Sequence, residues 1–82
     1  MEIAERERQL QEAVLGVLLD SYPAWWSGEE IVREVADDAA VFGERDAVGN
    51  AIRDLVRYGL AHRVGEFYLP TRAAFHAARL DT

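Results

Sequence analysis

The feature that most constrains the fold is a helical pattern that leads through a glycine directly into two short strand patterns. Over 44–58, apolar residues recur at three- and four-residue spacing, which predicts an amphipathic helix. Gly59 follows as the expected C-terminal cap, since glycine accepts the left-handed backbone conformation that ends many helices. The β-like runs 60–64 and 67–69 flank Gly65-Glu66, which predicts a two-residue hairpin.

The first helical pattern, over 3–20, carries more apolar residues than one buried stripe requires. Its main stripe predicts a face packed on the core and consists of Leu10, Ala13, Val14, Val17 and Leu18. Leu15 and Leu19 form a second apolar ridge on the other side. We expect this ridge either to pack against the last helix of the chain or to form a dimer interface with a second copy.

Capping signals place two more helices. Ser27 and Glu30 have the S-x-x-E spacing of a capping box, which predicts a second helix from Gly28. Thr71 is the expected N-cap of a last helix, whose packed side would contain Ala74, Phe75 and Ala78. The connection 38–43 is expected to place two apolar side chains beneath it, Val41 and Phe42. Before the second helix we expect a short strand or extended link that contains Trp25 and Trp26. These tryptophans are expected in core or subdomain packing, with one of them partly exposed, rather than as a base-stacking surface.

Length and composition fit one small globular domain. The chain has 82 residues, of which 50% are hydrophobic and 29% charged. It contains no cysteine, so a disulfide framework and a cysteine zinc site are excluded and a reducing compartment is favoured. We see no secretory signal and no apolar run near about 20 residues, and therefore expect a cytoplasmic protein without a membrane segment. Arginine provides all 9 basic residues, which is typical of a high-GC bacterial genome.

Charge is distributed unevenly along the chain. Residues 1–46 hold 12 of the 15 acids and 4 of the 9 arginines, whereas residues 47–82 hold 3 acids and 5 arginines. The formal net charge of −6 opposes non-specific attraction to nucleic acid. The basic groups are nevertheless concentrated where the third helix and the hairpin are predicted.

Catalytic chemistry has little support in the sequence. The two histidines, His62 and His76, have no neighbouring cysteine and no carboxylate at helical spacing. Ser21 and Ser27 have no visible base partner, and no glycine-rich phosphate loop occurs. We therefore expect no enzyme activity, no metal and no cofactor.

The outward side of the predicted third helix offers groups that suit DNA. Asn50 has the donor and acceptor needed for an adenine edge, and Arg53 and Arg57 suit guanine edges or phosphates. The competing interpretation is a solvated face on which these arginines pair with Asp54. Helix composition alone favours that second interpretation.

The hairpin adds cations beside this helix. His62 and Arg63 lie on its first strand and Arg72 lies just after the second, so that phosphates and the minor groove are their expected targets. Four phosphate contacts would give a slope of about −3.6 for log binding constant against log salt concentration, which means weak DNA binding by one copy. The contacts would come from Arg53, Arg57, Arg63 and Arg72. Two copies on adjacent half-sites would double it, which connects DNA binding with the Leu15 and Leu19 dimer hypothesis.

The segment 48–71, VGNAIRDLVRYGLAHRVGEFYLPT, resembles the recognition helix and wing of bacterial winged helix-turn-helix domains. The similarity lies in the Ala-Ile-Arg-x-Leu core, the aromatic-Gly-Leu helix end and the Arg-Val-Gly hairpin that closes on Tyr-Leu. The resemblance implies a mainly helical α+β fold with a three-helix core, a β-hairpin wing and a C-terminal helix. It implies one winged helix-turn-helix domain over 1–82, with its core at about 10–78.

Two functions follow from this resemblance and the charge pattern. The leading one is double-stranded DNA binding as a small transcriptional regulator, with Asn50, Arg53 and Arg57 in the groove and His62, Arg63 and Arg72 at the flank. The alternative is an acidic winged-helix module that binds a protein partner and no DNA.

Overall fold

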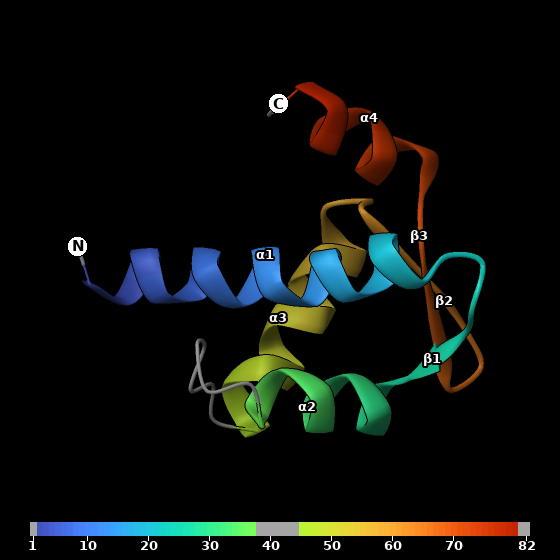
Figure 1. Cartoon of the computed structure of the whole chain (residues 1–82). Helices are drawn as coiled ribbons and strands as arrows, with labels where there is room; N and C mark the ends of the chain where they lie inside the picture. Colours follow the sequence, from blue (N-terminus) through green and yellow to red (C-terminus); the bar gives the residue numbers. More distant parts are fainter. Residues whose placement is uncertain (1, 38–44, 81–82) are drawn as a thin grey trace.

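The chain folds into a mainly helical α+β structure with a small antiparallel sheet (Figure 1). This computed structural model describes residues 2–37 and 45–80. The predicted connection 38–43, with Val41 and Phe42, lies outside the described residues. Within them the elements are, in chain order, α1 (Glu2–Ser21), β1 (Trp26–Ser27), α2 (Gly28–Ala36), α3 (Arg45–Arg57), β2 (Ala61–Val64), β3 (Phe67–Pro70) and α4 (Arg72–Leu80).

The core lies among α1, α2 and α3. The predicted stripe of α1 is confirmed, because its side chains at four-residue spacing, Leu10, Val14 and Leu18, are all buried. Full burial of one such side chain contributes about 1.5–3 kcal/mol to folding. Seven further buried side chains complete this core: Ile31, Val35, Val48, Ala51, Ile52, Leu55 and Ala61.

The predicted capping box begins α2. The Ser27 hydroxyl accepts a hydrogen bond from the Glu30 amide at 3.1 Å, and the Ser27 amide donates to Glu30 Oε1 at 2.9 Å. The hydrogen bond from the Ser27 amide to the carboxylate lowers the pKa of Glu30, because it favours the ionised form. Two backbone donors that the helix start leaves unpaired are thereby satisfied.

The three strands form an antiparallel sheet in the order β1-β3-β2. The register pairs Tyr68 with Trp26 on one side and with Arg63 on the other. Since directly opposed residues share a face of a sheet, these three side chains lie on the same face. The predicted turn joins β2 to β3, with Gly65 at φ +62°. The link before α2, predicted as a short strand or extended link, therefore contributes the third strand.

The end of α3 is held by backbone bonds that require a left-handed residue. Gly59, at φ +78°, donates its amide to the Val56 carbonyl oxygen at 3.1 Å, and the Leu60 amide donates to Leu55 at 2.8 Å. This pair of bonds is the Schellman motif. The Thr71 hydroxyl donates to the Gly59 carbonyl oxygen at 2.7 Å and accepts from the Ala74 amide at 3.2 Å. Thr71 thus caps α4, as predicted, and ties it to the end of α3.

The last helix, α4, contacts α1 and β3. Figure 1 shows α1 between α2 and α4. Ala74 is buried, as predicted, and Ala78 is half-buried. Phe75 remains 37% exposed and meets the ring of Tyr22 edge-on, with 5.1 Å between ring centroids. Its predicted place on the packed side is therefore only partly realised.

Both tryptophans make packing contacts, and Trp25 is the more exposed of the two. Its side chain is 54% exposed and packs edge-on against Phe67 with 5.8 Å between ring centroids. Trp26 is half-buried and packs against the core. Trp25 lies just before β1, which begins at Trp26.

The second apolar ridge of α1 is half-buried. Leu15 packs against the core, and Leu19 is partly covered. Their proposed role as a dimer interface stays a prediction. Among the helices that the structure describes, none is long and apolar enough to cross a membrane.

Candidate functional site

The outward side of α3 carries the polar groups that the sequence singles out. Asn50, Arg53 and Arg57 are all exposed. The guanidinium of Arg53 donates from Nη2 to Asn50 Oδ1, one helical turn away. This bond uses one of the two lone pairs of the Asn50 amide oxygen, so Arg53 and a base edge would share that oxygen unless Arg53 turns aside.

A groove of about 290 Å³ separates α3 from the β2–β3 hairpin. We call it the hairpin groove. Its lining combines three arginines with two less polar side chains: Arg53, Arg57, Arg63, Val56 and Tyr68. No acid is among the described residues that line it. The groove therefore presents three guanidinium groups, from a helix and a strand, to whatever binds there.

Strand alternation explains why Arg63 belongs to this groove. Ala61 is buried against the core, and Arg63, two residues later, points to the same face of the sheet. Its Nε donates to the Gly65 carbonyl oxygen at 2.8 Å, which holds the guanidinium near the turn. Arg63 is exposed, so the remaining donors stay accessible to a ligand.

Two predicted contact residues lie elsewhere. His62 is exposed on β2, where alternation turns it to the opposite face from Arg63. Arg72 is exposed at the first position of α4 and does not line the hairpin groove. Of the four arginines predicted to act together, the structure places three in one groove and leaves the fourth beside the sheet.

A second, larger groove of about 740 Å³ lies between α1 and α3. We call it the helix groove. α1 contributes Arg6, Glu7, Leu10 and Gln11, and α3 contributes Ala47, Asn50, Ala51, Arg53, Asp54 and Arg57. Leu10 and Ala51 are buried and form an apolar floor, whereas most of the charged groups stand at the rim. The sequence did not predict this groove. Four-residue spacing places Arg6 and Leu10 on one side of α1. The sequence does not indicate that this side packs against α3.

A polar contact between side chains joins the two walls of the helix groove. Gln11 Nε2 donates to Asp54 Oδ2 at 3.4 Å, a long hydrogen bond between partly buried side chains. Asp54 lines the helix groove and not the hairpin groove. The carboxylate nearest to the α3 arginines in sequence is therefore directed toward α1.

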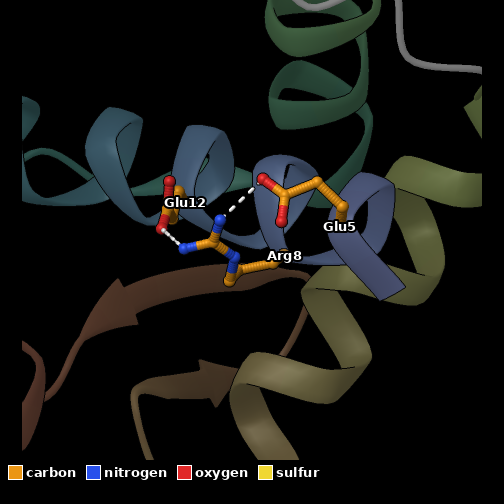
Figure 2. Close-up of polar contacts among 3 residues, drawn as sticks. All are labelled: Glu5, Arg8 and Glu12. Atoms are coloured by element: carbon orange, nitrogen blue, oxygen red, sulfur yellow. Dashed lines mark hydrogen bonds and ion pairs between the residues drawn. The ribbon is translucent and has the colours of Figure 1, made fainter. Parts of the chain in front are cut away.

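The exposed side of α1 is crossed by a three-residue charge chain (Figure 2). Arg8 lies 2.6 Å from the carboxylate of Glu5 and 3.5 Å from that of Glu12. The hydrogen bond with Glu5 is the main reason that the pKa of Arg8 is raised. Such pairs at three- and four-residue spacing support a helix locally. None of these three residues is among the described residues that line the helix groove.

A contrasting acidic surface lies on α2. Its exposed carboxylates belong to Glu29, Glu30, Glu34 and the adjoining Asp37, with Arg33 among them. The acidic first half of the sequence and the cation-rich second half thus become separate surfaces, α2 and the hairpin groove. Among the described residues, no group of three or more histidine, aspartate or glutamate side chains could hold a metal ion.

Comparison of the chain with protein-family models, with curated proteins and with solved structures finds no significant match.

Proposed function

We propose that this protein is a bacterial, cytoplasmic winged helix-turn-helix protein that binds double-stranded DNA as a small transcriptional regulator. The element order supports the family: a helix, a strand, two helices, a hairpin and a last helix. The sheet order β1-β3-β2, with the hairpin next to α3, also fits a recognition helix and its wing. The region over which the resemblance holds contains the whole hairpin groove.

The observation that carries the DNA-binding proposal is the hairpin groove with its three arginines and no acid among the described lining residues. Guanidinium groups bind phosphate oxygens through paired, charge-assisted hydrogen bonds. Arg57 and Arg63 would hold the backbone while α3 lies in the major groove. Asn50 would then supply the base contact, once Arg53 exchanges its bond with Asn50 for a phosphate.

The number of cations sets the expected strength. Three phosphate contacts give a salt slope of about −2.7 for each bound copy, which corresponds to weak DNA binding. Arg72 and His62 would add to it only where the DNA extends along the sheet. Two copies on neighbouring half-sites would double the electrostatic part, so DNA binding by a dimer remains part of this proposal, with Leu15 and Leu19 as the candidate contact.

The acidic surface of α2 favours one competing function. Its four exposed carboxylates would repel a phosphate backbone and suit a basic protein partner instead. In that case the arginines of the hairpin groove would bind no ligand, and α2 would be the surface that contacts the partner protein. The two functions place the partner on different elements of the fold.

Nuclear magnetic resonance mapping distinguishes these two functions. Uniformly labelled protein is titrated with mixed-sequence duplex DNA at low salt, and backbone amide shifts are followed. The proposal predicts shifts in α3 and at the β2–β3 turn, with the α2 amides unchanged. Absence of shifts in α3 and the hairpin, at protein and DNA concentrations of about 100 µM, would contradict it, since non-specific binding of DNA-binding proteins has Kd values of about 1–100 µM.

A further inference from the structure

Arg53 and Arg57 line both the helix groove and the hairpin groove. They project from consecutive turns of α3, with the hairpin on one side of them and α1 on the other. A ligand that engages these guanidinium groups from the α1 side would compete with one that needs them on the hairpin side. This sharing couples two sites that otherwise have separate walls.

We propose that the helix groove between α1 and α3 binds a small amphipathic organic anion, and that its binding weakens DNA binding by engaging Arg53 and Arg57. This regulatory step rests on the proposed DNA-binding function, whereas the anion site itself does not. The effector is defined by its chemistry: a flat or short apolar body that carries one carboxylate, sulfonate or phosphate group.

The size and floor of the groove account for the apolar body. Its volume of about 740 Å³ lies within the range of small-molecule sites, about 300–1,000 Å³. Leu10 and Ala51 form the floor and Ala47 a half-buried part of the wall. A ligand that covers the apolar surface at the base of the groove removes it from water, which favours binding.

The rim accounts for the anionic group. Among the described lining residues, three arginines reach it, Arg6 from α1 and Arg53 and Arg57 from α3, against two acids, Glu7 and Asp54. Asp54 already accepts a hydrogen bond from Gln11, and this bond crosses the groove. The rim therefore has an excess of positive charge, and its arginines come from both walls, so that an anion would be held between two helices.

The test uses anilinonaphthalene sulfonate, whose fused rings and sulfonate match this chemistry. Fluorescence and amide shifts are measured without DNA, and the amides of Ala47 and Ala51 are expected to shift. The probe can also meet the aromatic side chains Tyr22, Trp25 and Phe75, so the position of the shifts decides. Shifts confined to the aromatic residues would overturn the anion site, even if DNA binding is found.

Variants test the walls of the groove separately. Ala47→Phe fills the groove and should abolish probe binding there, whereas Ala73→Phe, at an exposed position of α4, should leave it unchanged. Arg6→Gln removes the α1 cation without adding bulk and should lower the affinity for the probe by about tenfold. Equal probe affinity in wild type and Arg6→Gln would contradict the proposed anion contact, whatever the stability of Ala47→Phe.

Competition tests the regulatory step. Saturating probe should weaken duplex DNA binding by wild type about tenfold, and the same factor should appear when DNA is titrated first, since coupling is reciprocal. DNA bound with equal affinity in the presence and absence of bound probe would overturn the coupling. Probe binding at Ala47 without any DNA binding would leave the anion site standing and contradict the DNA-binding proposal instead.

Discussion

Gln11 on α1 donates a hydrogen bond from Nε2 to Oδ2 of Asp54 on α3, at 3.4 Å. The two residues are far apart in the sequence, and their contact crosses the helix groove. It directs the one carboxylate in the middle of α3 away from the hairpin. This arrangement leaves the hairpin groove with arginines and no acid among its described lining residues.

Asp54→Asn should strengthen DNA binding about twofold at low salt, with the gain declining at higher salt. The substitution removes a negative charge near the arginines, and a partly screened charge at this range is worth tenths of a kcal/mol. Asparagine keeps an oxygen that can accept from Gln11, so the fold should persist. Fluorescence anisotropy with labelled duplex measures the effect, and weaker binding by Asp54→Asn would count against the phosphate contact.

Gly59→Ala should destabilise the protein by about 1 kcal/mol, because a residue with a Cβ is strained at the left-handed end of α3. Gly16→Ala is the matched control, since Gly16 lies within α1 and a Cβ there meets nothing within 4 Å. That variant should gain about 0.5–1 kcal/mol from helix propensity. Urea unfolding measures both, and a neutral Gly59→Ala would show that the Schellman motif contributes little.

The capping box of α2 should make stability depend on pH in the acidic range. The lowered pKa of Glu30 means that its ionised form is stabilised in the folded protein. This contribution is fully present above the ordinary glutamate pKa of about 4.3 and is lost as pH falls through the lower folded value. Thermal unfolding of Glu30→Gln from neutral pH to about pH 3 should therefore show a shallower decline than wild type. Glu29→Gln, one position earlier, should follow wild type, and an identical decline in all three proteins would refute this role of Glu30.

Phe75→Ala should loosen α4 from the rest of the protein. The edge-on contact with Tyr22 joins α4 to the end of α1, and an aromatic pair contributes about 0.5–1.5 kcal/mol beyond the area it buries. Hydrogen exchange of α4 amides should accelerate while α3 amides change less. Tyr58→Ala, at a residue that is 61% exposed, is the control and should leave exchange in α4 unchanged. Equal effects of the two substitutions would mean that the Tyr22 contact does not hold α4.

Much of the fold could be predicted because its signals are local. The capping residues Ser27 and Thr71, the left-handed Gly59 and the turn at Gly65 each act on backbone groups a few residues away, so the sequence contains both partners. Four-residue spacing likewise predicted which side of α1 is buried. The ends of the predicted helices and strands are close to the observed ones for the same reason.

The grooves depend on contacts between distant segments, which spacing does not specify. The helix groove exists because α1 crosses α3, and nothing near Arg6 in the sequence indicates that neighbour. The hairpin groove depends on the sheet register that sets Arg63 opposite Tyr68, which also excludes His62 from that face. Which of the two tryptophans is the more exposed also depends on the sheet, because Trp26 pairs with Tyr68 in β1 whereas Trp25 lies just before that strand.

The salt dependence of DNA binding by an arginine double variant tests the central claim most directly. Wild type should bind mixed-sequence duplex with a log–log slope of about −2.7 per copy between ~50 and ~200 mM salt, and Arg57→Gln with Arg63→Gln should reduce this to about −0.9. Arg33→Gln, which removes one cation from the acidic helix α2, should keep the wild-type slope. Two results would contradict DNA binding through the hairpin groove. One is the absence of salt-dependent binding by micromolar wild-type protein even at ~50 mM salt, and the other is a double variant that keeps the wild-type slope.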